Sequence, residues 1–181
     1  MKTKKILLIS LVLLSIFVLA ACTTQAPATD SANEQTEADA VTSASQAVDE
    51  ESFKKGISKE GNFIVITSSD LSFTEDLLVD GEFLNSSGNP VRSLALAQYD
   101  EDGNPIRYKL TVPRIAINSE NTLLEYGTIE GDVYIQAPGF RTKEATIDGN
   151  LYFATQELLD EFAADELSSV TKEIGVKEYT E

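Results

Sequence analysis

The chain has 181 residues, enough for one domain with short appendages. It carries 14 Lys and Arg against 30 Asp and Glu, a net charge of −16, so it repels nucleic acid backbones and we expect no nucleic acid partner. The absence of histidine excludes His-based catalytic triads and His-ligated metal sites. A single cysteine excludes an internal disulfide and a Cys cluster for zinc or iron–sulfur, so we expect no metal and no cofactor.

Residues 1–21 have the three parts of an export signal. Lysines at positions 2, 4 and 5 precede an almost wholly apolar run over 6–19, and the segment ends in Leu19-Ala20-Ala21-Cys22. This pattern resembles a bacterial lipoprotein signal with its lipobox. The resemblance implies cleavage before Cys22 and attachment of a diacylglyceryl group to the sulfur of Cys22.

Two readings compete with the lipoprotein signal. An uncleaved transmembrane helix would need about 20 apolar residues, and this run has about 14. A secreted protein would leave Cys22 as an incidental thiol, but the only cysteine stands where a lipobox requires it. We therefore expect an exported protein held on the outer face of the bacterial cell membrane, because two acyl chains anchor stably where one does not.

Residues 22–48 comprise the lipidated cysteine and an acidic tether. The tether consists mainly of Thr, Ser, Ala, Gln, Asp and Glu, with Pro27, and has no aromatic residue, Leu, Ile, Lys or Arg. It cannot bury enough apolar area to offset the entropy of ordering it, which predicts a disordered spacer.

Residues 49–181 are expected to form a domain that is mainly β. A short helix is predicted over 49–59, with Phe53 and Ile57 on one face and Gly61 as its C-cap. Strand patterns follow at 63–66, 71–73, 77–79, 94–99 and 106–112. The last two flank Asp100-Glu101-Asp102-Gly103-Asn104-Pro105, which predicts a hairpin rather than a calcium loop.

An internal repeat is the most informative feature of the domain. Residues 128–135, TIEGDVYI, align with residues 146–153, TIDGNLYF, at an offset of 18. One further step of 18 places 115–117 on the same strand, with Pro113 at the glycine position. The aligned strands predict two inward rows, Ile115/Val133/Leu151 and Ile117/Ile135/Phe153, and one outward row, Ala116/Tyr134/Tyr152.

A repeat of this length with an apolar–acid–glycine corner is typical of one coil of a β-helix. The predicted fold is a short, single-stranded, right-handed β-helix with helical caps, and a small β-sandwich built from hairpins is the alternative. A C-terminal helix is predicted over about 155–166, with Thr155 as its N-cap and Leu158, Leu159 and Phe162 on one face. A last strand over 174–179 would follow it.

The corner Ile-x-Gly-Asp/Asn-aliphatic-Tyr-aliphatic resembles the bactofilin-type, polymer-forming β-helix repeat over residues 110–153. The whole chain resembles small surface lipoproteins of Gram-positive, clostridia-like bacteria that carry such a repeat, a resemblance that implies no activity. Bactofilins are cytoplasmic and many-coiled, and they polymerise end to end. Because this chain has an export signal, few coils and a predicted cap, we expect a monomer, with a polymer as the alternative.

Two surface features are candidate sites. Tyr134 and Tyr152 could form an exposed platform for a sugar, and the alternative is a structural ladder. The corner acids Glu130, Asp132 and Asp148 could bind a cation weakly, although solvated or amide-bonded corner acids are the commoner arrangement.

No catalytic constellation is recognisable in the sequence, so no catalytic residue is assigned. We expect a non-enzymatic lipoprotein of the cell envelope, structural or partner-binding, whose contacts are the bilayer through Cys22 and an envelope protein or a glycan. The alternative is a carbohydrate-binding or carbohydrate-active β-helix protein.

Overall fold

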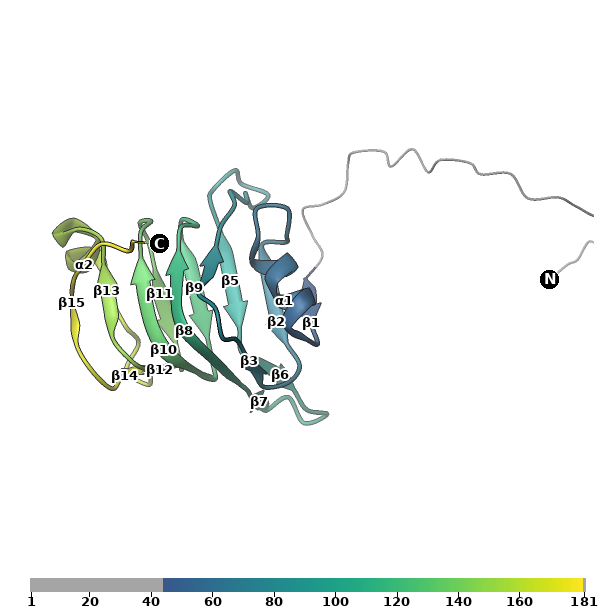
Figure 1. The fold of residues 1–181 in the computed structure, drawn as a ribbon. Helices are drawn as coiled ribbons and strands as arrows, with labels where there is room; N and C mark the ends of the chain where they lie inside the picture. Colours follow the sequence, from purple (N-terminus) through teal and green to yellow (C-terminus); the bar gives the residue numbers. More distant parts are fainter. Residues whose placement is uncertain (1–43, 181) are drawn as a thin grey trace, which may run out of the picture. The chain divides into compact units, whose positions relative to one another are not determined.

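A computed structural model describes residues 44–180, which are mainly β (Figure 1). One sheet, here called sheet A, has the strand order β1-β2-β5-β9-β11. Its strands are β1 (Ser45–Ala47), β2 (Ile64–Thr67), β5 (Arg92–Ala95), β9 (Thr122–Glu125) and β11 (Arg141–Lys143). Every pairing within sheet A is parallel.

The second sheet, sheet B, also pairs only in parallel. Its strands are β3 (Leu71–Ser72), β4 (Leu77–Val79), β8 (Lys109–Ile117), β10 (Thr128–Ile135), β12 (Thr146–Asp148), β13 (Leu151–Phe153), β14 (Ser169–Val170) and β15 (Ile174–Val176). From β2 to β13, segments in sheet A alternate along the chain with segments in sheet B. Each pass of the chain over this range therefore adds to both sheets.

The 18-residue repeat is in register across sheet B. Thr128 pairs with Thr146, and Tyr134 pairs with Tyr152, both at the predicted offset of 18. β8 joins the same register at Ile115–Ile117. The six predicted inward residues are at most 1% exposed, so the inward rows are confirmed as the centre of the core.

Gly131 lies at an irregularity between β8 and β10. The register shifts by one residue there, because Val112 and Pro113 together oppose the single Gly131. Gly131 has φ +152°, and a Cβ at this position would lie 1.8 Å from the carbonyl oxygen of Val112. Gly149 repeats the close approach one pass later, 1.9 Å from the carbonyl of Gly131. Both corner glycines are thus required by backbone contact between passes.

Antiparallel pairing in sheets is confined, among the named strands, to the hairpin of β6 (Ala97–Tyr99) and β7 (Pro105–Arg107). The predicted hairpin therefore exists, but it is shorter than the strands predicted over 94–99 and 106–112. Leu94 and Ala95 belong to β5, and residues 109–112 belong to β8, both in parallel sheets. The apolar–polar alternation could not show where β5 ends and β6 begins, or where β7 ends and β8 begins, because the same alternation continues across each boundary.

Helix α1 (Glu50–Ile57) confirms the first predicted helix. Asp49 caps it, accepting a hydrogen bond from the backbone N–H of Ser52, and Phe53 and Ile57 are buried as expected. The C-cap is Ser58 and not Gly61, so that prediction was wrong. Gly61 instead lies against the carbonyl of Gly56, where a Cβ would come within 2.0 Å of the oxygen.

Strand structure is present before residue 49, where the domain was predicted to begin. Ser45–Ala47 form β1, paired with Val65–Thr67, and Ala47 is completely buried. The predicted tether over 22–48 is therefore too long at its C-terminal end. Small residues such as Ala47 bury little area alone, and their composition did not distinguish them from a spacer.

Helix α2 (Gln156–Glu161) is shorter than the predicted 155–166. Thr155 caps it as expected, but Phe162 is already extended, and its ring lies 5.2 Å from that of Phe153 and 5.9 Å from that of Phe140. The chain then continues through β14 and β15, a further pass beyond the repeat. α2 lies at the β13 and β15 end of the molecule, where Leu158 and Leu159 pack against the core, and it precedes this last pass in the chain (Figure 1).

Candidate functional site

A cavity with a volume of about 750 Å³ lies over the outer face of sheet A. In β2, β5 and β9 alternate residues point out of the sheet, and aliphatic side chains dominate the floor they form. This groove is lined by Gln46, Phe63, Ile64, Ile66, Asn85, Val91, Arg92, Ser93, Ala95, Ala97, Gln98, Tyr99, Asn121, Leu123, Glu125, Tyr126 and Arg141. It combines an apolar floor with a rim of polar side chains, the usual character of a ligand site.

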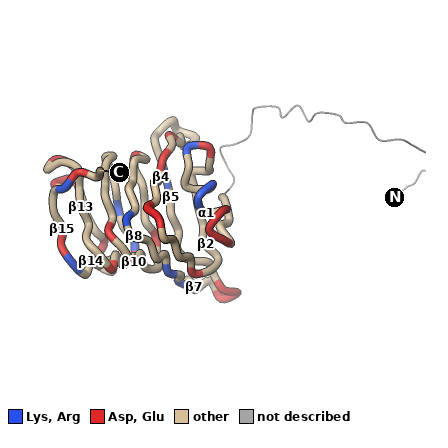
Figure 2. The backbone as a smooth tube through the Cα atoms, in the orientation of Figure 1, with Lys and Arg blue, Asp and Glu red and all other residues tan. Residues whose placement is uncertain are grey.

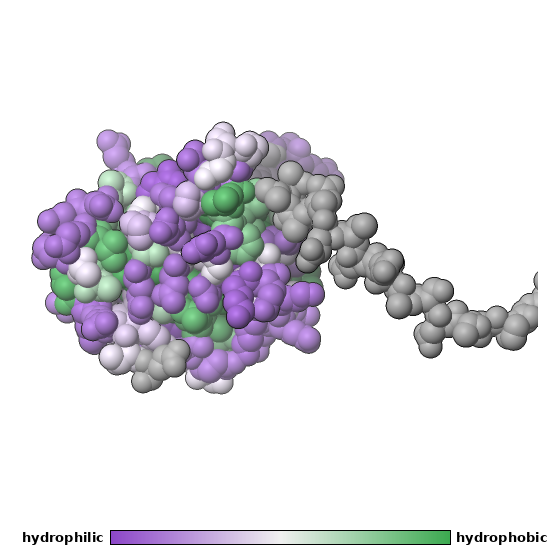
Figure 3. Space-filling model, turned by 90° about the horizontal axis from the view of Figure 1, so that it is seen from above, coloured by the Kyte–Doolittle hydropathy of each residue, from purple (hydrophilic) through white to green (hydrophobic). Residues whose placement is uncertain are grey.

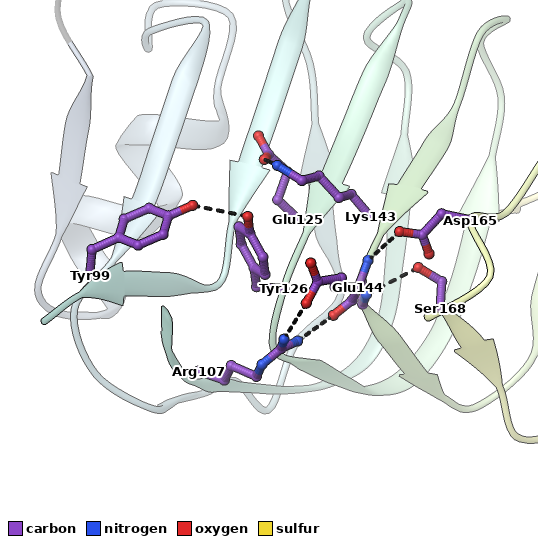
Figure 4. Close-up of polar contacts among 9 residues, drawn as sticks. Tyr99, Arg107, Glu125, Tyr126, Lys143, Glu144, Asp165 and Ser168 are labelled. Atoms are coloured by element: carbon purple, nitrogen blue, oxygen red, sulfur yellow. Dashed lines mark hydrogen bonds and ion pairs between the residues drawn. The ribbon is translucent and has the colours of Figure 1, made fainter. Parts of the chain in front are cut away.

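The hairpin forms one wall of the groove and brings Tyr99 to it (Figure 4). Tyr99 is 60% exposed, and its hydroxyl donates to the hydroxyl of Tyr126 at 3.0 Å. The two rings meet edge to face with their centroids 6.0 Å apart. Within the hairpin turn, the Asp100 carboxylate accepts the N–H groups of Asp102 and Asn104 at 3.0 and 2.8 Å. Those contacts fit a closed turn.

Tyr126 is fixed by its backbone and by two cations. It has φ +59°, rare for a bulky residue, and is followed by Gly127 at +60°. The Lys143 ammonium lies 5.0 Å from the centre of the Tyr126 ring, and the Arg107 guanidinium lies 5.3 Å from it. The unusual backbone, held by these contacts, aims the Tyr126 ring along the wall of the groove.

The charged end of the groove is internally paired (Figure 4). Glu125 accepts a hydrogen bond from the Ser93 hydroxyl at 2.9 Å, and its carboxylate lies 3.3 Å from the ammonium of Lys143. The neighbouring Tyr126 hydroxyl and Glu125 raise the pKa of Lys143 well above its usual value. Hydrogen bonding to Tyr99 and the charge of Lys143 lower the pKa of Tyr126. This end of the groove therefore places the Tyr99–Tyr126 pair beside the Glu125–Lys143 ion pair.

Arg107 anchors the hairpin to the following pass (Figure 4). Its guanidinium donates to the carbonyl oxygen of Glu144 at 2.6 Å and to the Glu144 carboxylate at 2.5 Å. The N–H of Glu144 in turn donates to the Asp165 carboxylate at 2.8 Å. The wall is thus tied to the scaffold, which keeps Tyr99 beside the groove.

Arg141 is the uncompensated charge of the groove. It is exposed on β11 and, within residues 44–180, makes no ion pair or side-chain hydrogen bond. In the same range, the side chains of Gln46, Gln98 and Asn121 also take part in no hydrogen bond. Four polar side chains are therefore available to a ligand above the apolar floor.

Tyr134 and Tyr152 lie away from this groove, on the outer face of sheet B. Their ring centroids are 5.3 Å apart, as adjacent passes require. Tyr134 is only 4% exposed, so the expected exposed pair is wrong for Tyr134. Residues near the C-terminus cover both rings. The Tyr179 ring lies 5.4 Å from the ring of Tyr134, and the Lys177 ammonium lies 4.8 Å from the centre of the Tyr152 ring.

The three corner acids each have a partner of their own. Glu130 accepts from Lys109 at 2.6 Å, Asp148 accepts from Thr171 at 2.7 Å, and Asp132 accepts the N–H of Asn150 at 3.0 Å. Lys109 and the Thr111 hydroxyl lower the pKa of Glu130. Across residues 44–180 no group of three or more Cys, Asp or Glu side chains is placed to hold a metal ion.

The groove residues were not singled out from the sequence. The available signal was the run Phe63–Ile66, in which Ile64 and Ile66 are aliphatic at positions that face outward. Tyr126-Gly127 at a sharp turn was a second signal. Cys22 and the export signal lie outside the described residues, and within 44–180 no helix has the length and apolarity to cross a membrane.

Comparisons with protein-family models, with curated proteins and with solved structures found no match to this chain.

Proposed function

We propose that this chain is an exported, lipid-anchored protein whose folded part is a short β-helix acting as a non-enzymatic binding module of the cell envelope. The alternation of the chain between two parallel sheets, with an in-register repeat, supports the β-helix. Parallel crossovers are right-handed in about 98% of cases, which favours the right-handed form.

The anchor rests on the signal and on Cys22. In the organism of origin, Cys22→Ala should move the protein from the membrane fraction to the soluble exported fraction and abolish labelling by a fatty acid. A Cys22→Ala protein that stays in the membrane fraction would overturn the lipid anchor.

The groove over sheet A is the proposed binding site, and a glycan is the proposed ligand. Sugar rings carry both apolar C–H faces and hydroxyl groups. The aliphatic floor and the exposed Tyr99 ring could pack against the C–H faces of a sugar ring. The side chains that make no hydrogen bond could bind its hydroxyl groups; these are Gln46, Gln98, Asn121 and Arg141. The observation that carries this proposal is the coexistence of a large apolar floor with unused planar polar groups.

The groove offers little support for hydrolysis. A glycosidase needs two carboxyl groups flanking the bond that is cut. Glu125 is the only carboxylate among the residues that line the groove, and it is paired with Ser93 and Lys143. We therefore favour binding without turnover.

The test is a glycan array with the mature chain, followed by calorimetry on the best ligand. Tyr99→Ala should weaken binding about tenfold or more without lowering the melting temperature, because Tyr99 is exposed. Tyr152→Ala on sheet B is the matched control and should leave affinity unchanged. If the array shows no binding, or if Tyr152→Ala alone abolishes it, the groove is not a glycan site and a protein partner becomes the better reading.

A further inference from the structure

The last strand of sheet B leaves a free edge. β15 pairs on one side with β13: the Glu173 carbonyl accepts from the N–H of Leu151 at 2.9 Å, and the N–H of Lys177 donates to the carbonyl of Phe153 at 2.8 Å. In a parallel ladder alternate residues bond the same neighbour, so the peptide groups of Ile174 and Val176 point away from β13. No described strand lies beyond β15 to receive them.

The apolar core is only partly covered at this end, where Leu158, Leu159 and Phe162 pack against it. Ile174 and Val176 are in register with Leu151 and Phe153, which are at most 1% exposed. Yet Ile174 and Val176 are 47% and 48% exposed, and nearby Leu167 is 71% exposed. Apolar surface is visible at the left end of the view in Figure 3, the end at which β15 lies in Figure 1. An open edge with exposed aliphatics is a template for strand pairing.

The opposite end of the stack is closed. α1 packs Phe53 and Ile57 into the core there, at 1% and 2% exposure. The two ends therefore differ: α1 buries its apolar face at one end, and β15 leaves Ile174 and Val176 about half exposed at the other.

The sequence of the open edge is self-complementary. Residues 172–178 read Lys-Glu-Ile-Gly-Val-Lys-Glu, and basic and acidic segments alternate along β15 (Figure 2). If two copies run antiparallel about Gly175, Lys172 faces Glu178, Glu173 faces Lys177, and Ile174 faces Val176. Every charged residue then meets an opposite charge, and the aliphatic residues meet each other.

We propose that two copies of this chain associate through their β15 edges as an antiparallel, two-fold symmetric dimer. In this register the residues that would exchange hydrogen bonds are Ile174 and Val176, whose peptide groups are free. A slip of one residue would bring Glu173 opposite Glu178, or Lys172 opposite Lys177. A parallel arrangement would stack each charge on itself. Only the register centred on Gly175 satisfies both the backbone and the charges.

The same geometry limits the assembly to two copies. A two-fold contact uses the same surface of each partner and closes on itself, so the β15 edge is used up once two copies have paired. The contact is small by the standard of stable interfaces, below about 1,200 Å², so we expect dissociation in the micromolar range. The dimer is independent of the groove, and each can fail without the other.

Disulfide trapping tests the register directly. In the mature chain carrying Cys22→Ser, Gly175→Cys should form a covalent dimer under mild oxidation, because residue 175 faces its own copy across the two-fold axis. A Cβ at Gly175 meets no atom closer than 3.5 Å, so the substitution should fold. Ser87→Cys, in an exposed loop, is the control and should form much less covalent dimer. Equal trapping of both variants would overturn the proposal.

Charge exchange tests the pairing by sedimentation equilibrium. Glu173→Lys or Lys177→Glu alone should weaken dimerisation about fivefold or more, and the two together should restore it, because the exchanged pair is again complementary. Glu60→Lys, an equal charge change at an exposed site near α1, should leave the dimer intact. A chain that stays monomeric at several hundred micromolar, a double variant no better than the singles, or species larger than a dimer would each overturn the proposal.

Discussion

Individual glycines are fixed here by contacts between passes of the chain. The carbonyl of Val112 occupies the space that a side chain on Gly131 would need, and the carbonyl of Gly131 does the same to Gly149. The glycine in the apolar–acid–glycine corner of the repeat is therefore needed because the backbone of the neighbouring pass leaves no room for a side chain. The acids beside these glycines serve the same corners through hydrogen bonds, as between Asp132 and Asn150.

Gly131→Ala should accordingly cost more than about 3 kcal/mol of unfolding free energy, because β8 and β10 must separate to admit the methyl group. Gly103→Ala is the matched control. Gly103 also has a positive φ, +82°, but a Cβ there meets nothing within 4 Å, so only about 1 kcal/mol of backbone strain is expected. Urea denaturation of both variants measures the difference. Equal losses would mean that backbone conformation, and not the close contact, makes Gly131 necessary.

At the scale of elements, the stability of helix α1 depends on its N-cap residue, Asp49. Asp49 and Ser52 cap each other: the Asp49 carboxylate accepts the N–H of Ser52 at 2.8 Å, and the Ser52 hydroxyl accepts the N–H of Asp49 at 3.1 Å. Hydrogen bonds from the Ser52 hydroxyl and N–H lower the pKa of Asp49 below its ordinary value of 3.8.

Asp49→Ala should lower the melting temperature by a few degrees at pH 7, and Asp49→Asn should lower it less, because Asn also caps helices. A lowered pKa in the folded state means that the carboxylate stabilises the fold above pH 3.8, and that this contribution is lost as pH falls through the folded pKa. The advantage of the natural chain over Asp49→Asn should thus shrink from pH 6 to pH 3. Thermal melts across this range test it, and a constant difference would contradict it.

Elements with a periodic pattern were predictable, and elements made by tertiary contact were not. The register of β8, β10 and β13 follows from an 18-residue repeat whose inward rows are all aliphatic or aromatic. By contrast, α2 ends at Glu161 because the Phe162 ring packs on Phe140 and Phe153, and no local signal marks that point. β1 exists because β2 offers it an edge, which the composition of 45–47 cannot reveal.

At the scale of the whole molecule, the two sheets have different outer faces. Sheet A carries the open groove, whereas Tyr134 and Arg114 on sheet B are covered by residues near the C-terminus. The sequence identified the tyrosines of sheet B but could not show that Tyr179, 45 residues away from Tyr134, covers one of them. The groove was missed for the converse reason, since its wall and floor come from passes that carry no repeat.

The two ends of the stack differ as well. α1 buries its apolar face against the first strands, while β15 leaves peptide groups and aliphatic side chains uncovered. A fold with two closed ends would be expected to stay monomeric, and one with two open ends would grow into filaments. The uncovered edge of β15, with its complementary charges, favours a pair.

The C-terminal residues also set the order in which the molecule can be completed. The Tyr179 hydroxyl lies 3.3 Å from the carboxylate of Asp76, a contact between residues 103 positions apart, and the Arg114 guanidinium donates to the carbonyl of Thr180 at 2.9 Å. During synthesis from the N-terminus, the early passes can stack while these partners are still absent. The outer face of sheet B therefore stays exposed to solvent and to other chains until Tyr179 and Thr180 have been synthesised. A chaperone that shields a newly made chain would have its longest access to this face.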